Sequence, residues 1–266
     1  MRLAHLLRSI LPMPMPMAMA MALALCSGTV AAAQPIQAVQ QARALIVVTT
    51  HDWDSTQARL QTFTRTDGQW RPAGAGFAVA LGRRGSAWGE GLHPAQPNGP
   101  QKREGDGRSP AGVFAIGPAF GYATHLNTAL PYQAMTATHY CMDVPTSPLY
   151  NRIVDAAQVG QAAVAGSTEP MRLDLRTPGD GRYREGFVIA HNPAAIAGRG
   201  SCIFAHLWRS PGQVTAGCTA MDPADMQRLL AWLKPADHPL FVLLPRAEYA
   251  RLQTTWQLPA LDEAAP

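Results

Sequence analysis

Short apolar runs separated by turns rich in glycine and proline are the feature that most constrains the fold of this chain. Apolar runs of about four to eight residues with β-branched members are typical of strands, whereas helices are longer. The clearest runs are residues 44–50, 59–65, 76–81, 113–116, 187–190, 202–205 and 240–244. Two segments have the pattern of helices, residues 223–233 and 246–255. The sequence therefore predicts a mainly β domain, a sandwich or barrel, with a helix soon after residue 218.

Turn and cap residues mark where several of these elements begin and end. Asp67-Gly68 lies between two strand-like runs and predicts a tight hairpin turn. Asp222 and Pro223 have the pattern of the N-cap and first residue of a helix. One face of that helix is apolar, through Met226, Leu229, Leu230 and Leu233. The intervening segments are predicted as a loop over residues 82–112 and one more strand near residues 171–175.

The N-terminal residues have the pattern of a secretory signal peptide. Two arginines, Arg2 and Arg8, precede an apolar run over residues 13–25, and small residues end at Ala33. We therefore expect cleavage after Ala33, export to the periplasm or cell envelope, and no membrane span in the mature protein. An uncleaved anchor is the alternative, but the run is short for a span and contains prolines. Lipidation at Cys26 is a third possibility, which the large residue before it disfavours.

The mature chain has the size of one substantial domain. Cleavage would leave 233 of the 266 residues, and no internal repeat divides them. We expect a flexible lead-in over residues 34–43, the main domain over 44–245, and a C-terminal helix and tail over 246–266. Loss of two arginines would lower the net charge from +4 to +2. A charge this small, without a basic run, argues against nucleic-acid binding.

Three cysteines remain after cleavage, Cys141, Cys202 and Cys218. An odd number of cysteines in an exported protein leaves at least one thiol without an intramolecular partner. A disulfide between Cys141 and Cys202 would leave Cys218 free, and the alternative is that both are small buried apolar residues. Spacing alone does not decide between these alternatives. A thiol that persists in an oxidising compartment usually has a chemical role.

Cys218 and His206 are the candidate catalytic pair. Cys218 lies on a turn before the predicted helix, and His206 ends an apolar run 12 residues earlier. A thiol and an imidazole brought together form an activated nucleophile for acyl transfer. His206 would accept the thiol proton and return it to the leaving amine. The alternatives are an inert buried cysteine and a core histidine.

Neighbouring residues are candidates for supporting roles. Gly217 would allow a tight or positive-φ turn that exposes the sulfur, and nearby N–H groups would stabilise an oxyanion. A backbone carbonyl just after His206, or Thr215, would orient the imidazole. Trp208 and Arg209 would line a substrate groove, where Arg209 would pair with a substrate carboxylate. Surface packing is the alternative for both residues.

Other kinds of site are disfavoured. His191 would lie at the far end of the 187–190 and 202–205 hairpin, about 15 to 20 Å from His206, so a structural role is expected. The cysteines and histidines lack the spacing of zinc ligands. Residues 102–114 resemble a phosphate-binding loop superficially, but they lack the Gly-Lys-Ser/Thr ending and precede a strand.

Three blocks of the chain, in a fixed order, resemble one known family. Residues 105–114 are similar to a Gly-x-x-Arg/Lys-Thr/Ser-Pro-x-Gly-x-Phe stretch. Residues 203–206 are similar to a strand that ends on a catalytic histidine, and residues 215–218 to a Ser/Thr-x-Gly-Cys nucleophile motif. The chain thus resembles the L,D-transpeptidase (YkuD-like) family of cell-wall enzymes. It departs from the family in a shorter histidine-to-cysteine spacing, typical of a shorter-loop branch, and in Ala220, where arginine or asparagine is common.

The resemblance implies a mainly β, sandwich-like domain and a two-step acyl transfer. Cys218 would attack the L-centred diamino acid carbonyl of a peptidoglycan stem peptide and expel the terminal D-amino acid, leaving a thioester. An amine from a second stem would then give a 3–3 cross-link, whereas water would give an L,D-carboxypeptidase. The resemblance implies no cofactor or metal, and carbapenem-type inhibitors are expected to react.

Two other functions stay open at this point. The first is a non-catalytic peptidoglycan-binding or envelope protein on the same scaffold, which the replacement at Ala220 motivates. The second is an unrelated exported cysteine peptidase. That second function is disfavoured because such enzymes commonly place the cysteine before the histidine, which is the reverse of the order found here.

Overall fold

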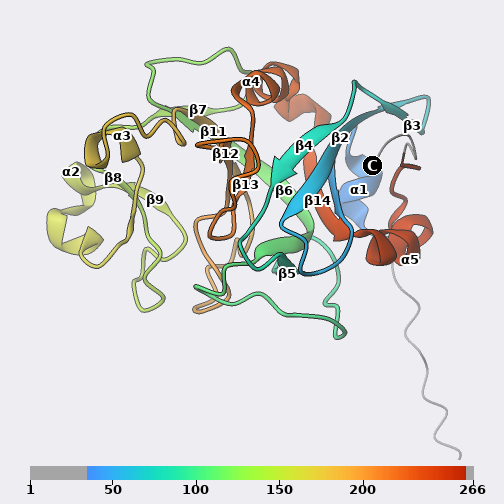
Figure 1. Ribbon diagram of the computed structural model, residues 1–266, viewed down its shortest axis with the longest axis horizontal. Coiled ribbons are helices and arrows are strands. Elements are labelled where there is room, and N and C mark those ends of the chain that lie inside the picture. Colours follow the sequence, from blue (N-terminus) through green and yellow to red (C-terminus); the bar gives the residue numbers. More distant parts are fainter. Residues whose placement is uncertain (1–34, 262–266) are drawn as a thin grey trace, which may run out of the picture. The chain divides into compact units, whose positions relative to one another are not determined.

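Eight of the eleven strands in the main sheet close into a β-barrel in the computed structural model, which describes residues 35–261 (Figure 1). Pairing of β1 with β2 closes the ring. The remaining strands β3 (Gln69–Pro72), β5 (Ser86–Trp88) and β7 (Tyr132–Ala134) extend it beside β2 or β6. The barrel strands, in order around the ring, are β1 (Ala44–Thr50), β14 (Leu240–Pro245), β6 (Ser109–Gly121), β11 (Glu185–Ile189), β12 (Phe204–Leu207), β13 (Thr219–Met221), β4 (Phe77–Ala80) and β2 (Gln57–Thr66).

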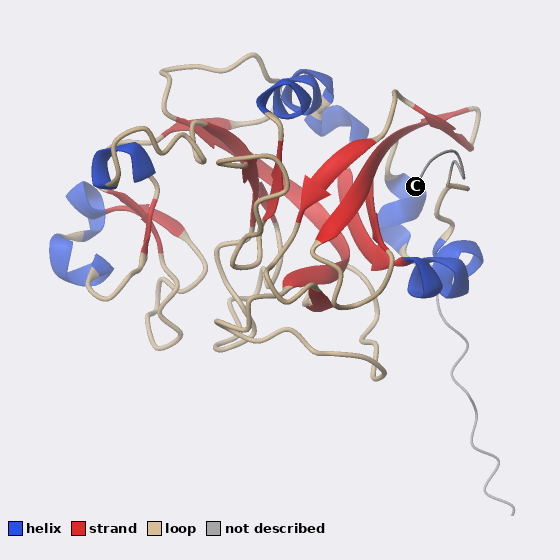
Figure 2. Cartoon of the chain, in the orientation of Figure 1, coloured by secondary structure: helices blue, strands red, loops and turns tan. Residues whose placement is uncertain are grey.

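The predicted mainly β class is therefore confirmed, in its barrel form. Figure 2 shows how little of the described chain is helical. The helical elements are α1 (Gln37–Gln41), α2 (Ala156–Val159), η1 (Gln161–Val164), α3 (Leu173–Arg176), α4 (Pro223–Trp232), η2 (Pro235–Asp237) and α5 (Arg246–Trp256). The predicted signal peptide lies outside the described residues.

A smaller sheet of three strands lies at the left of Figure 1. Its order is β10 (Glu169–Pro170), β8 (His139–Cys141) and β9 (Ile153–Asp155). These strands, with α2, η1 and α3, belong to residues 135–184 between β7 and β11, here called the insert. One apolar cluster of the insert has only three buried members, Met142, Ala156 and Val164. Because its strands are so short, the insert has little sheet of its own to hold it together.

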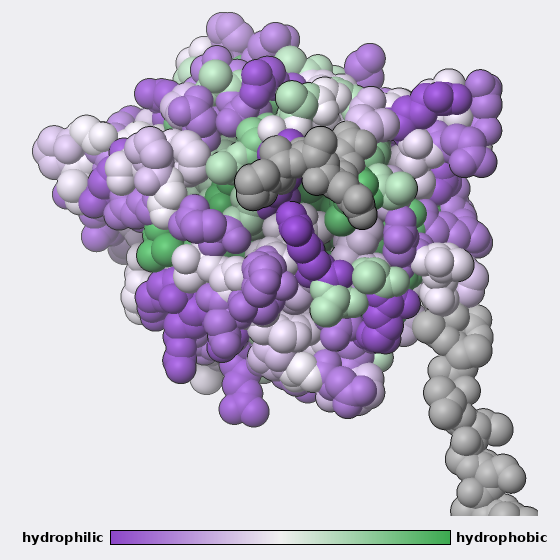
Figure 3. All heavy atoms as spheres, turned by 45° about the vertical axis from the view of Figure 1, so that its right-hand side comes forward, coloured by the Kyte–Doolittle hydropathy of each residue, from purple (hydrophilic) through white to green (hydrophobic). Residues whose placement is uncertain are grey.

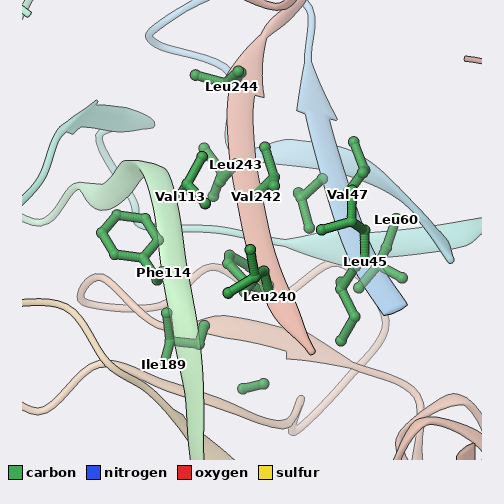
Figure 4. Close-up of a cluster of buried hydrophobic side chains, with 14 of the residues drawn as sticks. Leu45, Val47, Leu60, Val113, Phe114, Ile189, Leu240, Val242, Leu243 and Leu244 are labelled. Carbon is green, nitrogen blue, oxygen red and sulfur yellow. The ribbon is translucent and has the colours of Figure 1, made fainter. Parts of the chain in front are cut away.

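The barrel core is apolar on both faces of its central strands. All residues of β1 and β14 are buried, which explains their continuous rather than alternating apolar sequence. Figure 4 shows leucine and valine side chains of β1, β14 and β6 packed together with Ile189 of β11. The last helix, α5, packs on β1 and β14 from outside through Leu252 and Trp256. This packing fixes the barrel from which the loops of the candidate site project.

The helix after residue 218 forms as predicted. Asp222 caps α4 by accepting a hydrogen bond from the Ala224 N–H at 2.9 Å, and Pro223 is its first residue. Met226, Leu229 and Leu230 are buried. The predicted hairpin turn is also present, with left-handed φ values of 50° at Asp67 and 76° at Gly68. Helix α4 packs against β11 and β12, so it supports the strand that carries His206.

Three segments differ from expectation. The predicted loop over residues 82–112 contains β5 and the start of β6, where Gly112 has a φ of 136°. A Cβ there would lie 2.0 Å from the His93 ring, so glycine is required within this strand. Residues 171–175 contain no strand: the two-residue β10 ends just before them at Pro170, and α3 begins at Leu173. The lead-in contains a helix that the sequence did not predict, α1, which buries Val39 completely.

Between residues 35 and 261, no helix combines the length and apolar character that a membrane span needs. Hydrophilic side chains predominate on the face seen in Figure 3, where apolar ones form small separate groups. The large apolar residues that are exposed come from separate segments: Leu92, Val159, Leu175, Ile196 and Val214.

Candidate active site

The fold brings Cys218 and His206 to one cavity of about 340 Å³. Strand β12 carries His206, and Cys218 directly precedes β13, which is the parallel neighbour of β12. The register pairs His206 with Ala220 and Ala205 with Thr219. The hairpin predicted for β11 and β12 is present as an antiparallel pair, with His206 opposite Gly186. Two adjacent strands of one barrel therefore deliver the two groups of the candidate pair to the same cavity.

The His206 imidazole is buried and held by a backbone carbonyl. Its Nδ1 lies 2.7 Å from the Leu207 carbonyl oxygen, so the ring donates from Nδ1 and leaves Nε2 as an acceptor. Burial lowers the pKa of His206 to about 4, although the hydrogen bond to Leu207 opposes this shift. The Tyr183 ring packs edge-on against the imidazole at 5.2 Å between centroids. At neutral pH the imidazole is thus uncharged and ready to accept a proton.

The Cys218 thiol is the free cysteine of the described chain and is 7% exposed. The Phe204 N–H donates to Sγ at 3.3 Å, and the thiol points to the Cys202 carbonyl oxygen at 3.5 Å. Burial raises the pKa of Cys218 to about 12, and the nearby Glu169 carboxylate adds to the shift. The sulfur is therefore a neutral thiol at rest, and it needs a base to become a nucleophile.

The turn before Cys218 is held by two hydroxyl groups. Thr215 Oγ1 and Ser109 Oγ both donate to the Cys218 carbonyl oxygen, at 2.7 and 3.1 Å. The Gly217 N–H donates to Thr215 Oγ1, so this N–H is already occupied in the structure. A Cβ on Gly217 would lie 3.0 Å from the Arg108 carbonyl oxygen. Gly217 therefore serves a close backbone approach rather than a positive φ.

These contacts show how distant sequence blocks meet. Ser109 and Arg108 belong to residues 105–114, and they pack directly on the turn that carries Cys218. The imidazole is oriented by the carbonyl that follows it, which was one of the two predicted alternatives. Thr215, the other alternative, instead fixes the Cys218 backbone.

A disulfide joins Cys141 of β8 to Cys202, just ahead of β12. Cys202 has a left-handed φ of 56°, and its N–H donates to Asn151 Oδ1 at 2.9 Å. Asn151 also donates to the carbonyls of His191 and Asn192. The insert is thus tied to Cys202 twice, through the disulfide and through Asn151. The carbonyl of Cys202 is the one that contacts the Cys218 thiol.

The insert contributes a charged wall to the cavity. Asp180 accepts hydrogen bonds from Arg182 at 2.8 Å and from Arg209 at 2.7 Å. Burial alone would raise the pKa of Asp180, but these hydrogen bonds outweigh it and lower the pKa to about 2. Two guanidinium groups therefore share one carboxylate, which leaves one positive charge beside the cavity. Glu169 of β10 lies in the same wall and accepts a hydrogen bond from the Tyr183 hydroxyl.

The predicted substrate-lining residues both reach this cavity. Trp208 and Arg209 line it together with Cys218 and His206. The prediction missed Tyr183, Glu169 and Arg182, which come from the insert. No periodic pattern marks these three, and only their long-range contacts place them beside the thiol.

His191 lies away from the cavity and has both ring nitrogens occupied. Nδ1 accepts a hydrogen bond from the Glu90 N–H at 3.2 Å, and Nε2 donates to the Arg199 carbonyl at 2.9 Å. Burial lowers its pKa to about 4, so it is a neutral residue that ties loops together. Across the described part of the chain, no group of three or more histidine, cysteine or acidic side chains is arranged to hold a metal ion.

Comparison with known proteins identifies the family. The family model for the L,D-transpeptidase catalytic domain, YkuD, matches residues 52–242, which is more than half of the chain. The match includes the barrel from β2 to the first half of β14 as well as the insert. Searches of curated proteins and of solved structures find no match. The chain therefore belongs to the L,D-transpeptidase catalytic-domain family.

Proposed function

We propose that this protein is an exported cysteine acyltransferase that acts on peptidoglycan stem peptides. Members of the family act on peptidoglycan peptides, which supplies the substrate class. The observation that carries the proposal is the convergence of the Cys218 thiol and the neutral His206 imidazole on one cavity. Cys218 acts as the nucleophile, and His206 acts as the general base and acid.

The first step forms a thioester. His206 Nε2 accepts the thiol proton while Sγ attacks the carbonyl of the L-centred diamino acid residue. The imidazolium then donates this proton to the nitrogen of the departing D-amino acid, so the peptide C–N bond breaks and the C–S bond remains. In the second step an amine gives a 3–3 cross-link, or water gives the L,D-carboxypeptidase product. Because both groups are neutral at rest, the proton moves only when a substrate is present.

The positively charged part of the cavity fits the carboxylate of the departing D-amino acid. Arg182 and Arg209 share Asp180, which neutralises only one of them. A guanidinium group binds a carboxylate through paired N–H donors. Trp208 lies beside Arg209 and supplies an apolar surface for the peptide. These contacts orient the scissile carbonyl towards Cys218.

A non-catalytic peptidoglycan-binding protein is the second candidate. The observation that favours it is the burial of Cys218, which raises the thiol pKa and lowers its reactivity in the resting state. Ala220, fully buried on β13, also stands where the family often has arginine or asparagine. This candidate predicts stem-peptide binding without a covalent intermediate.

Incubation of the purified protein with a tetrapeptide muropeptide, followed by mass spectrometry, tests the proposal. We expect a covalent adduct on Cys218 with release of the terminal D-amino acid, and the same site should react with a carbapenem. Both adducts should be absent in His206→Ala at neutral pH. A folded protein that binds muropeptide and forms no adduct would establish the second candidate. Export is tested separately by sequencing the N-terminus of envelope-derived protein, which we expect to begin at Gln34.

A further inference from the structure

Three carboxylates line the cavity, Glu104, Asp143 and Glu169, and among them only Glu169 has an oxygen without a hydrogen-bond partner in the described part of the chain. The cavity is lined by three cations, Lys102, Arg182 and Arg209, and each forms an ion pair with Asp106 or Asp180. Glu169, which is partly buried in the same wall, forms no ion pair with any residue between 35 and 261. Its Oε1 accepts the Tyr183 hydroxyl, and no hydrogen bond to Oε2 is present within the same range.

The surroundings of this carboxylate favour a cationic ligand. Burial raises the pKa of Glu169 to about 7, since Asp143 adds to the shift while Tyr183 and Arg182 only partly oppose it. Arg182 is turned towards Asp180, where it makes its hydrogen bonds. A carboxylate removed from water without a counterion gains free energy when a positive group enters beside it. An alkyl ammonium group has the charge and the donors to fill this position.

Glu169 is also close to both members of the candidate pair. Its charge contributes to the raised pKa of Cys218. The Tyr183 side chain that donates to it packs on the His206 imidazole, with ring centroids 5.2 Å apart. A cation held at Glu169 would therefore lie on the insert side of the thiol, beside the base. An amine held there would share the cavity with a thioester formed at Sγ.

We infer, resting on the function proposed above, that Glu169 binds the ammonium group of the acyl acceptor and accepts its proton. The thioester on Cys218 is thereby transferred to a primary amine in preference to water. The substrate class of the second step is a peptide with a free primary amine, and Glu169 is the residue that selects it.

The acceptor ammonium gives one proton to the Glu169 carboxylate and becomes a neutral amine. Its nitrogen lone pair forms the C–N bond at the thioester carbon, and the C–S bond breaks with its electrons on Sγ. The second nitrogen proton passes through His206 to the Cys218 thiolate. Glu169 then releases its proton to solvent, and an amide and the free thiol remain.

The experiment compares Glu169→Gln with Glu248→Gln, a matched control. Glu248 lies on α5 and pairs with Arg251, outside the cavity. Acylation of Cys218 by a tetrapeptide donor is measured first, and the ratio of amine transfer to hydrolysis second. For Glu169→Gln we expect a ratio of amine transfer to hydrolysis lower by about tenfold or more. Because the ratio is taken on the acylated enzyme, it does not depend on the acylation rate, which the lost charge can change through the pKa of Cys218. Acyl transfer to a neutral alcohol acceptor should be unchanged in Glu169→Gln. Glu248→Gln should match the wild type in both measurements.

Two further variants test whether Glu169 acts by binding the ammonium group or only by holding the Tyr183 side chain in place. Tyr183→Phe keeps the carboxylate, so the transfer ratio should stay well above that of Glu169→Gln. Glu169→Asp should recover part of the ratio. Equal losses in Tyr183→Phe and Glu169→Gln, or equal losses with amine, alcohol and water, would overturn the inference while leaving the proposed function intact. A wild-type chain that is never acylated would overturn the proposed function, and this inference with it.

Discussion

The barrel and the insert meet at the same cavity but are built in opposite ways. The barrel strands β1 and β14 are entirely buried, and their side chains belong to one large apolar cluster. The insert has strands of two or three residues, a small apolar cluster and a disulfide to the barrel side. The barrel supplies Cys218 and His206, whereas the insert supplies Glu169, Arg182 and Tyr183.

This difference indicates a division of labour. Groups that must keep a fixed mutual geometry come from strands whose register is set by a packed core. Groups that meet a variable substrate come from a segment with little sheet of its own, which is held by a covalent tether, by Asn151 and by an apolar cluster that it shares with the barrel. The following predictions test whether the two regions are as independent as their construction suggests.

The largest effect should come from the barrel pair. Cys218→Ala removes the nucleophile, so acyl transfer should fall by roughly 10⁴-fold or more. The thermal midpoint should change little, because the fold does not depend on the thiol. Turnover assays and calorimetry on the same preparation check this. Transfer activity that survives in Cys218→Ala would place the chemistry elsewhere.

Large-to-small substitutions in the two apolar clusters should differ in how much of the chain they destabilise. Phe241→Ala on β14 should cost about 3–5 kcal/mol of global stability, because it leaves a cavity in the barrel core. Met142→Ala should mainly lower the stability of the insert. Hydrogen exchange followed by mass spectrometry reads both regions at once. If Met142→Ala destabilised the barrel as much as Phe241→Ala did, the two regions would be one cooperative unit.

Removal of the tether should loosen the insert alone. The disulfide closes a sequence separation of 61 residues, and replacing both Cys141 and Cys202 by serine should cost about 2–4 kcal/mol. We expect faster exchange and faster proteolysis within residues 135–184, with the barrel protected. The initial acylation of Cys218 should slow less than amine transfer does. Uniform loosening of both regions would contradict this expectation.

Acidification should act on the two regions with opposite sign. His93, His191 and His206 are buried, and their folded pKa values of about 4 lie below the unfolded value of 6.5. The unfolded chain binds more protons in that window, so stability should fall by about 1–2 kcal/mol per histidine from pH 7 to pH 5. The pKa of Glu169 is about 7 in the folded chain and 4.5 in the unfolded chain. The stability that protonated Glu169 contributes to the fold is therefore lost as the pH rises from 4.5 to 7. Thermal midpoints of single His93→Gln and Glu169→Gln variants between pH 5 and 7 measure the two signs.

The same contrast explains what could be predicted from the sequence. The runs that became β1 and β14, the Asp222 cap and the Asp67-Gly68 turn are local signals, and all were correct. Cys218 and His206 could be proposed as the catalytic pair because a short motif carries each of them. The start of β6 was predicted as loop because it contains Gly112. Glycine is needed there because a side chain would collide with the His93 ring, and no local sequence pattern encodes that contact.

The insert was predicted least well. A strand of two residues, such as β10, is too short to show a period, so Glu169 had no recognisable context. Tyr183 is 14 residues from Glu169, and its link to His206 depends on how the insert folds back on the barrel. Only the three-dimensional arrangement reveals that these side chains share a cavity with the thiol.

The parallel pairing of β12 with β13 has a consequence for how this enzyme family can diversify. Hydrogen bonds between the two strands pair His206 with Ala220, and Thr215 holds the turn that carries Cys218. The stretch between Arg209 and Thr215 can therefore change in length without moving either group. Its length is free to be shaped by whichever peptide it must accommodate.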